Sequence, residues 1–143
     1  MGLGSAGGGI QVAPLSGGTA VVVLDRVRLD NNGTALSLQS SGGEIAAEVI
    51  DSVVTGSSVN GILALAGNPA VSLTITNSKL FYNVGAAVQA NGSNATVSID
   101  SSTITLNQFG VSRVSNGVLR SFQNNKIFGN TTDGTPIPAI GLQ

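Results

Sequence analysis

The sequence predicts an all-β protein that folds as a solenoid of about five coils, with 23–26 residues in each coil. Three observations predict this fold: a residue pattern that recurs at a nearly fixed interval, short alternating runs rich in Val and Ile, and the absence of helical patterning. In the recurring pattern, an apolar anchor is followed five positions later by a second apolar residue, and three positions after that by Asn or Ser. The first anchors, separated by 25, 26, 24 and 23 residues, are Leu24, Val49, Ile75, Ile99 and Phe122. A period in this range indicates that each repeat forms one coil stacked on the next.

The other positions of the pattern keep the same period. The second apolar anchors are Leu29, Val54, Leu80, Ile104 and Ile127. The polar position holds Asn32, Ser57, Asn83, Asn107 and Asn130. A corner Asn bonds the backbone of its own turn, and stacked Asn side chains bond one another along the axis. We therefore interpret this column as a structural ladder, and a row of ligand-binding side chains is the alternative.

A glycine follows the polar position in every unit, and we expect it to form a tight turn each time. These glycines are Gly33, Gly61, Gly85, Gly110 and Gly134.

Each coil is expected to contain three short strands. Residues 20–24, 71–75 and 95–99 alternate with period two, which is typical of strands. In the unit at 71–92, the first strand points Leu73 and Ile75 inward and a bend follows at 77–78. Leu80 then turns back to the core, and a third strand begins after Gly85. Neighbouring coils are expected to pair in parallel at about 4.8 Å.

The last coil conflicts with simple superposition of the repeats. There, Arg120 falls where Leu73 and Val97 point inward. Either the coil is shifted so that Val118 or Leu119 fills the core, or Arg120 reaches past the end of the stack. We favour the shift.

Composition excludes several classes of function. The chain has 143 residues and is expected to form one domain at 10–143, preceded by a flexible, Gly-rich segment at 1–9 that does not resemble a secretory signal. A net charge of −1 with 9% charged residues argues against a nucleic-acid partner. No run of about 18 apolar residues exists, so we expect no membrane partner, although the mean hydropathy is +0.32. Cys and His are absent, which excludes disulfides and a Ser/His/Asp triad.

We therefore expect no catalytic residue, no metal site and no cofactor. Glycosidases need two carboxylates that converge on one bond. Asp25 and Asp51, which fall in adjacent coils, are the carboxylates best placed to approach one another. We interpret them as solvated surface groups.

Three aromatic residues are the candidate binding residues. Phe81 and Phe128 both follow the second anchor and are expected to project outward with Thr105 between them, and Tyr82 lies beside Phe81. Such a strip can stack on sugar rings, form an oligomer contact, or be scattered surface apolarity. The sequence leaves all three interpretations open.

The repeats resemble the right-handed parallel β-helix family, the fold of pectate lyases, polygalacturonases and tailspike proteins. Segments 24–33 and 99–107 are similar to internal coils of bacterial right-handed β-helix repeat proteins of unknown function, and segment 118–134 is similar to their final coil. The resemblance covers about residues 10–140 and implies the fold without an activity. It also implies a C-terminal portion of a longer, secreted or cell-surface protein, whose cellular address the sequence itself leaves unknown.

We expect this chain to be a non-enzymatic structural or surface module. The alternatives are a truncated polysaccharide lyase or hydrolase and a carbohydrate-binding module, so polysaccharide is one expected partner. Self-association is the other. Pro136 and Pro138 are expected to protect the C-terminal sheet edge, whereas the N-terminal coil offers an open edge to another molecule.

Overall fold

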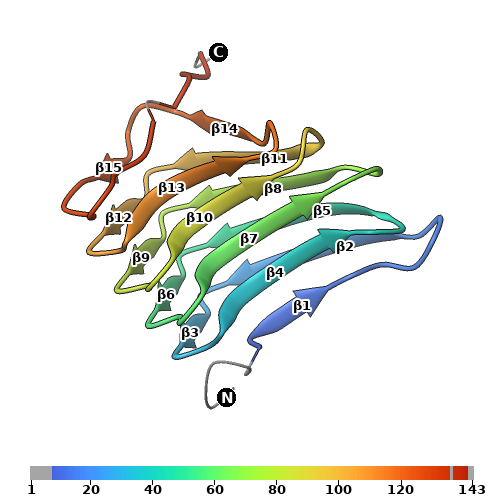
Figure 1. Cartoon of the computed structure of the whole chain (residues 1–143), viewed down its shortest axis with the longest axis horizontal. Helices are drawn as coiled ribbons and strands as arrows, with labels where there is room; N and C mark the ends of the chain where they lie inside the picture. The colour runs from blue at the N-terminus through green and yellow to red at the C-terminus, as the bar shows by residue number, and fades with distance from the viewer. Residues whose placement is uncertain (1–7, 136, 142–143) are drawn as a thin grey trace.

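The chain folds as a parallel β-solenoid of five turns, as the repeat predicts (Figure 1). Figure 1 shows the computed structural model, which describes residues 8–135 and 137–141. Within these residues every regular element is a strand and none is a helix. Of the predicted flexible segment 1–9, all but Gly8 and Gly9 lies outside the described residues, as does Pro136.

Three parallel sheets of five strands each form the walls of the solenoid, and every coil contributes one strand to each sheet. Sheet A contains β1 (Ile10–Val12), β4 (Thr34–Ser40), β7 (Asn60–Ala66), β10 (Ala86–Asn91) and β13 (Phe109–Val114). Sheet B contains β2 (Thr19–Asp25), β5 (Glu44–Ile50), β8 (Val71–Thr76), β11 (Ala95–Asp100) and β14 (Val118–Ser121). Sheet C contains the short strands β3 (Arg28–Asp30), β6 (Val53–Thr55), β9 (Lys79–Phe81), β12 (Thr103–Thr105) and β15 (Lys126–Ile127). Figure 1 shows the coils succeeding one another from the first described residues to the last along one axis.

The strand register follows the sequence period. In sheet B, Leu24 lies opposite Val49, and Ile75 lies between Val49 and Ile99. In sheet C, Leu80 lies between Val54 and Ile104. A strand shifted by one residue would turn its apolar side chains outward, so the buried face determines this register.

The core is a narrow column of aliphatic side chains. Its largest fully buried members include Leu36, Ile62, Leu73, Ile75, Leu80 and Ile99. Where the chain enters sheet A, an additional inward position holds small residues, as in Ala35, Gly61, Ala87 and Gly110. A Cβ on Gly110 would lie 2.8 Å from Nδ2 of Asn130, so only small residues fit beside the polar ladder.

The predicted shift of the last coil is confirmed, but Phe122 was wrong as the fifth anchor. Leu119 lies opposite Val97 with 1% of its surface exposed, and Ser121 takes the position opposite Ile99. Arg120 points to solvent and does not reach past the end of the stack. The following turn contains one extra residue, with Gln123 at a φ of 67°, which brings Ile127 back into register with Ile104. Phe122 falls within this longer turn and is only partly buried.

The expectation that the closing glycines are equivalent was also wrong. Gly85 lies in the column of Val59, and a Cβ there would lie 1.8 Å from the Val59 carbonyl oxygen. Gly61 and Gly110 occupy an inward-facing column two positions further along the chain. The turns accept different residues because they differ in length by one residue, which sequence spacing alone does not resolve.

We predict that Leu80→Ala lowers the free energy of unfolding by about 3 kcal/mol, because it removes a fully buried side chain from a column that cannot collapse. Urea denaturation followed by circular dichroism measures the effect. Val21→Ala, at a position 77% exposed, serves as the control and should change stability by less than about 0.5 kcal/mol. Equal effects of the two changes would contradict the placement of the core.

Candidate functional site

An asparagine ladder runs along the corner between sheets C and A. The backbone N–H and the Nδ2 of Asn83 both donate to Oδ1 of Asn107, at 3.0 and 2.8 Å. The same two groups of Asn107 donate to Oδ1 of Asn130, at 3.0 and 2.8 Å. Asn83 and Asn107 are 2% and 3% exposed, so ligands cannot reach these amides from solvent.

Asp133 terminates the ladder at its C-terminal end. Its Oδ1 accepts from the backbone N–H of Asn130 at 3.1 Å and from Nδ2 at 2.8 Å. The Asp133 carboxylate therefore accepts from Asn130 the same pair of hydrogen bonds that Asn130 accepts from Asn107. The sequence analysis missed this role, although Asp133 follows Asn130 by three residues and directly precedes Gly134, which are the features of a turn.

The ladder weakens towards the N-terminal end. Ser57 donates its backbone N–H to Oδ1 of Asn83 at 3.1 Å, but its own hydroxyl is buried without a partner. Asn32 is 6% exposed, and within the described residues its side-chain amide makes no hydrogen bond. The Ser side chain is too short to bridge one coil to the next, so Asn32 is separated from the ladder.

A second polar column follows the other corner of each coil, between sheets B and C. Ser52 N–H donates to Ser78 Oγ at 3.1 Å, and Ser78 N–H donates to Ser102 Oγ at 3.1 Å. Asn125 continues the column by accepting from the Ser102 N–H at 2.9 Å. The sequence analysis missed this column, although Ser recurs three positions after the anchors Val49, Ile75 and Ile99.

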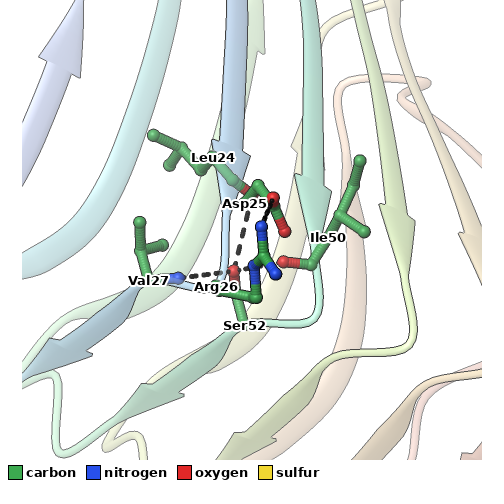
Figure 2. A network of polar contacts seen from close by, with 6 residues as sticks. All are labelled: Leu24, Asp25, Arg26, Val27, Ile50 and Ser52. Atoms are coloured by element: carbon green, nitrogen blue, oxygen red, sulfur yellow. Dashed lines mark hydrogen bonds and ion pairs between the residues drawn. The ribbon is translucent and has the colours of Figure 1, made fainter.

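Figure 2 shows where this serine column ends, in the first coil. Ser52 Oγ accepts from the backbone N–H of Val27 at 3.2 Å and donates to the carbonyl of Ile50 at 2.6 Å. Val27 has no side-chain acceptor, so the column stops there. From Asn83 to Asp133 in the first column and from Ser52 to Asn125 in the second, the polar side chains bond to members of their own column and to the backbone. We infer that the role of both columns is structural.

We predict that Asn107→Ala lowers the free energy of unfolding by about 3 kcal/mol, because it leaves the buried N–H and Nδ2 of Asn83 without their acceptor. Thermal and urea unfolding measure the effect. An unchanged unfolding midpoint would contradict a structural ladder.

Ser57 provides a matched test within the same column. Ser57→Asn is expected to raise the free energy of unfolding by about 1 kcal/mol, because the longer amide reaches both neighbouring coils. Ser57→Ala should be nearly neutral, since it removes a buried hydroxyl that has no partner. A large loss of stability in Ser57→Ala would show that the hydroxyl is bonded after all.

The three predicted aromatic residues lie on one outer corner. Phe81 and Tyr82 pack edge to face, with ring centroids 5.6 Å apart and planes at 71°. Phe128 lies two coils further on, beyond Thr105, which pairs with Phe81. Tyr82 and Phe128 are 62% and 54% exposed. Leu106, 49% exposed, lies between the coils of Tyr82 and Phe128. We name Phe81, Tyr82, Leu106 and Phe128 the aromatic corner.

Two residues of the aromatic corner hold an unfavourable backbone conformation. Tyr82 and Leu106 have φ angles of 54° and 58°, whereas Gly56 and Gly129 occupy the corresponding turns of other coils. The left-handed conformation costs a bulky residue about 1–2 kcal/mol. Backbone strain of this kind is common at functional sites, so bulky exposed apolar side chains at positions that favour glycine suggest a binding role.

The two candidate carboxylates bond to different partners. Asp25 pairs with Arg26 at 2.9 Å. Asp51 accepts from Nδ2 of Asn77, in the next coil, at 2.6 Å. Within residues 8–135 and 137–141, no group of three or more acidic side chains is arranged to hold a metal ion. The arrangement therefore offers no convergent acid pair at these positions.

A hollow of about 920 Å³ lies at the C-terminal end between β13, β14, residues 132–135 and Pro138. Arg113 lines it, extends from the inward position opposite Ala90 and donates to Thr135 Oγ1 at 3.1 Å. It is Arg113, and not Arg120, that reaches over the end of the stack.

Comparison with known proteins gives no match among family models, curated proteins or solved structures. In the part of the chain that the structure describes, no helix has the length and apolarity needed to cross a bilayer. A functional proposal therefore rests on the chain's own geometry.

Proposed function

We propose that this chain is a non-enzymatic structural or surface module built as a right-handed parallel β-helix. The observation that supports it is the internal use of the polar groups along the axis. Asn83, Asn107 and Asn130 bond to one another, as do Ser52, Ser78 and Ser102, and Asp25, Asp51 and Asp133 each have a protein partner. A solenoid with such corners is a rigid rod whose walls display other residues.

Because the repeats resemble those of bacterial right-handed β-helix proteins, we also propose that the solenoid is right-handed, as in pectate lyases. The resemblance also favours a secreted or cell-surface setting. The shape supports this setting, because a stack of coils presents long, flat faces for contact with other surfaces.

We predict that the protein releases neither unsaturated uronic acids nor reducing ends from pectate, alginate or other polysaccharides, with or without Ca²⁺. Absorbance at the unsaturated product and a reducing-end assay measure both. Turnover that coincides with the protein through two chromatographic steps would overturn the non-enzymatic proposal. Its loss in Asp51→Asn but not in Glu44→Gln would place that turnover at Asp51.

A carbohydrate-binding module is the second candidate, and the strained aromatic corner favours it. Phe81 and Phe128 are separated by two coil spacings, or about 10 Å, which lets two rings contact one extended polysaccharide. Exposed aromatic rings stack on apolar faces of sugars and other rings.

If the chain binds carbohydrate, a polysaccharide in the gel is expected to retard the protein in affinity electrophoresis. Tyr82→Ala and Phe128→Ala are each expected to raise the dissociation constant at least about fivefold, because each change removes a stacking contact of about 1 kcal/mol. Val23→Ala is the matched control, because Val23 is 58% exposed but lies on sheet B. Retardation that is equal in all variants would exclude the aromatic corner as the binding site.

A further inference from the structure

The two ends of the solenoid are finished differently. At the C-terminal end, the chain folds back over its last coil. The N–H groups of Gly110 and Val111 donate to the carbonyls of Thr132 and Asp133, at 2.8 and 3.2 Å. Ser121 N–H donates to the Pro138 carbonyl at 3.0 Å, and Ile137 packs against the core. The free edges of sheets A and B are thus partly occupied by residues 132–133 and 138–140.

The N-terminal end has no comparable covering within the described residues. Strand β1 pairs only with β4, β2 only with β5, and β3 only with β6. An edge strand leaves every second N–H and C=O without a partner strand. The longest of these edges, β2, spans seven residues, of which the first six carry no charge and no Pro. Natural edges of this length and apolarity are normally protected, because they pair with other chains.

The core is also open at this end. The inward side chains of the first coil remain partly exposed, and they are Ile10, Val12, Ala20, Val22, Leu24 and Leu29. Their partners one coil further on, such as Leu36, Val49 and Val54, are at most 1% exposed. We name the three free edges and these six side chains the N-terminal face.

One polar atom at the N-terminal face also lacks a partner among the described residues. Oδ1 of Asp30 is buried and accepts no hydrogen bond there, although Oδ2 pairs with Arg28. Asp30 lines a hollow of about 400 Å³ beside Gly8–Ile10. Buried polar groups in folded proteins are nearly always bonded, so this oxygen indicates that a donor approaches from outside.

The charges at the rim of this face favour a second copy of the same chain as the partner. Two acidic and two basic residues lie there, namely Asp25, Arg26, Arg28 and Asp30. Around a two-fold axis, such a neutral set faces itself with equal numbers of opposite charges, which avoids repulsion between the copies. Head-to-tail stacking is disfavoured, because residues 132–133 and 138–140 occupy edges that the second copy would have to offer.

We propose that two copies of this chain associate through their N-terminal faces, related by a two-fold axis, with the β2 edges paired antiparallel. The association buries the open core of both copies. It closes after two, because each dimer then presents only C-terminal ends, whose edges in sheets A and B are partly occupied. This inference is independent of whether the module is enzymatic, binding or structural.

The experiment is sedimentation velocity and light scattering of the full chain over a hundredfold range of concentration. The expected result is a concentration-dependent species at twice the 14.2 kDa of one chain. A single monomer throughout would overturn the proposal, and a ladder of trimers and longer species would replace the two-fold arrangement with head-to-tail stacking.

Two variants of Val23 test whether the β2 edge forms the contact. In β2 the even-numbered residues direct their N–H and C=O groups towards β5, as the bond from the Arg26 N–H shows, so the N–H of Val23 points away from β5. Val23→Pro removes this donor and is expected to raise the dimer dissociation constant at least about tenfold, which corresponds to about 1.4 kcal/mol. Val23→Ala keeps the N–H and is the matched control. Equal effects of the two changes would overturn the edge pairing.

Charge reversal is a second test that leaves the β2 backbone intact. Arg28→Glu makes the rim of the face acidic, whereas Arg120→Glu makes the same charge change on the exposed surface of the last coil. Only Arg28→Glu should weaken the dimer, at low salt by at least about fivefold, and circular dichroism shows that both variants fold. Weakening by Arg120→Glu alone would move the contact to the other end and overturn the proposal.

The absence of Cys allows a direct check of orientation. A single cysteine in Val21→Cys lies beside the N-terminal face, and one in Arg120→Cys lies on the last coil. A short bis-maleimide is expected to link the Val21→Cys chains into dimers and to leave the Arg120→Cys chains single. The reverse pattern would exclude contact through the N-terminal faces.

Discussion

Every part of this structure depends on burial between coils. A coil of about 25 residues is too thin to shield its own interior, so its aliphatic side chains leave water only when another coil lies above and below them. The parallel hydrogen bonds of the three sheets hold the coils at a fixed spacing, and the aliphatic columns at Leu80 and Ile75 determine the register. Stability is therefore distributed along the stack and is lowest where the stack ends.

The corners show how the same constraint acts on polar groups. A chain that turns three times per coil leaves buried backbone N–H groups at the bends, and these need acceptors that repeat with the coil. The Asn83–Asn107–Asn130 column and the Ser52–Ser78–Ser102 column supply them, and Asp133 ends the first of the two. Because these amides and hydroxyls bond inward, function has to lie on the walls or at the ends of the solenoid.

The walls and ends differ in how far they are completed. The aromatic corner places Tyr82 and Leu106 in a conformation better suited to glycine, which is understandable if their exposed side chains serve a contact. The N-terminal face leaves strand edges, apolar side chains and a carboxylate oxygen of Asp30 without partners, whereas the C-terminal end is covered by its own chain. A rod with one covered and one open end is suited to display a surface from a paired base.

The sequence by itself determined the solenoid, its five coils, the aliphatic anchors up to Ile99 and the polar column at Asn83, Asn107 and Asn130, because these features recur at the period of the coil and need no knowledge of distant contacts. It also predicted that Phe81 and Phe128 follow the second anchor on the outer side, with Tyr82 beside Phe81. Only the tertiary structure decided the length of each turn, the place of Ser121 instead of Phe122, the termination of the ladder at Asp133 and the different partners of Asp25 and Asp51. The physical reason is that one extra residue in a turn changes which side chains of the following residues face the core, until strand pairing restores the register. The spacing of the repeats in the sequence does not show in which turn that extra residue lies.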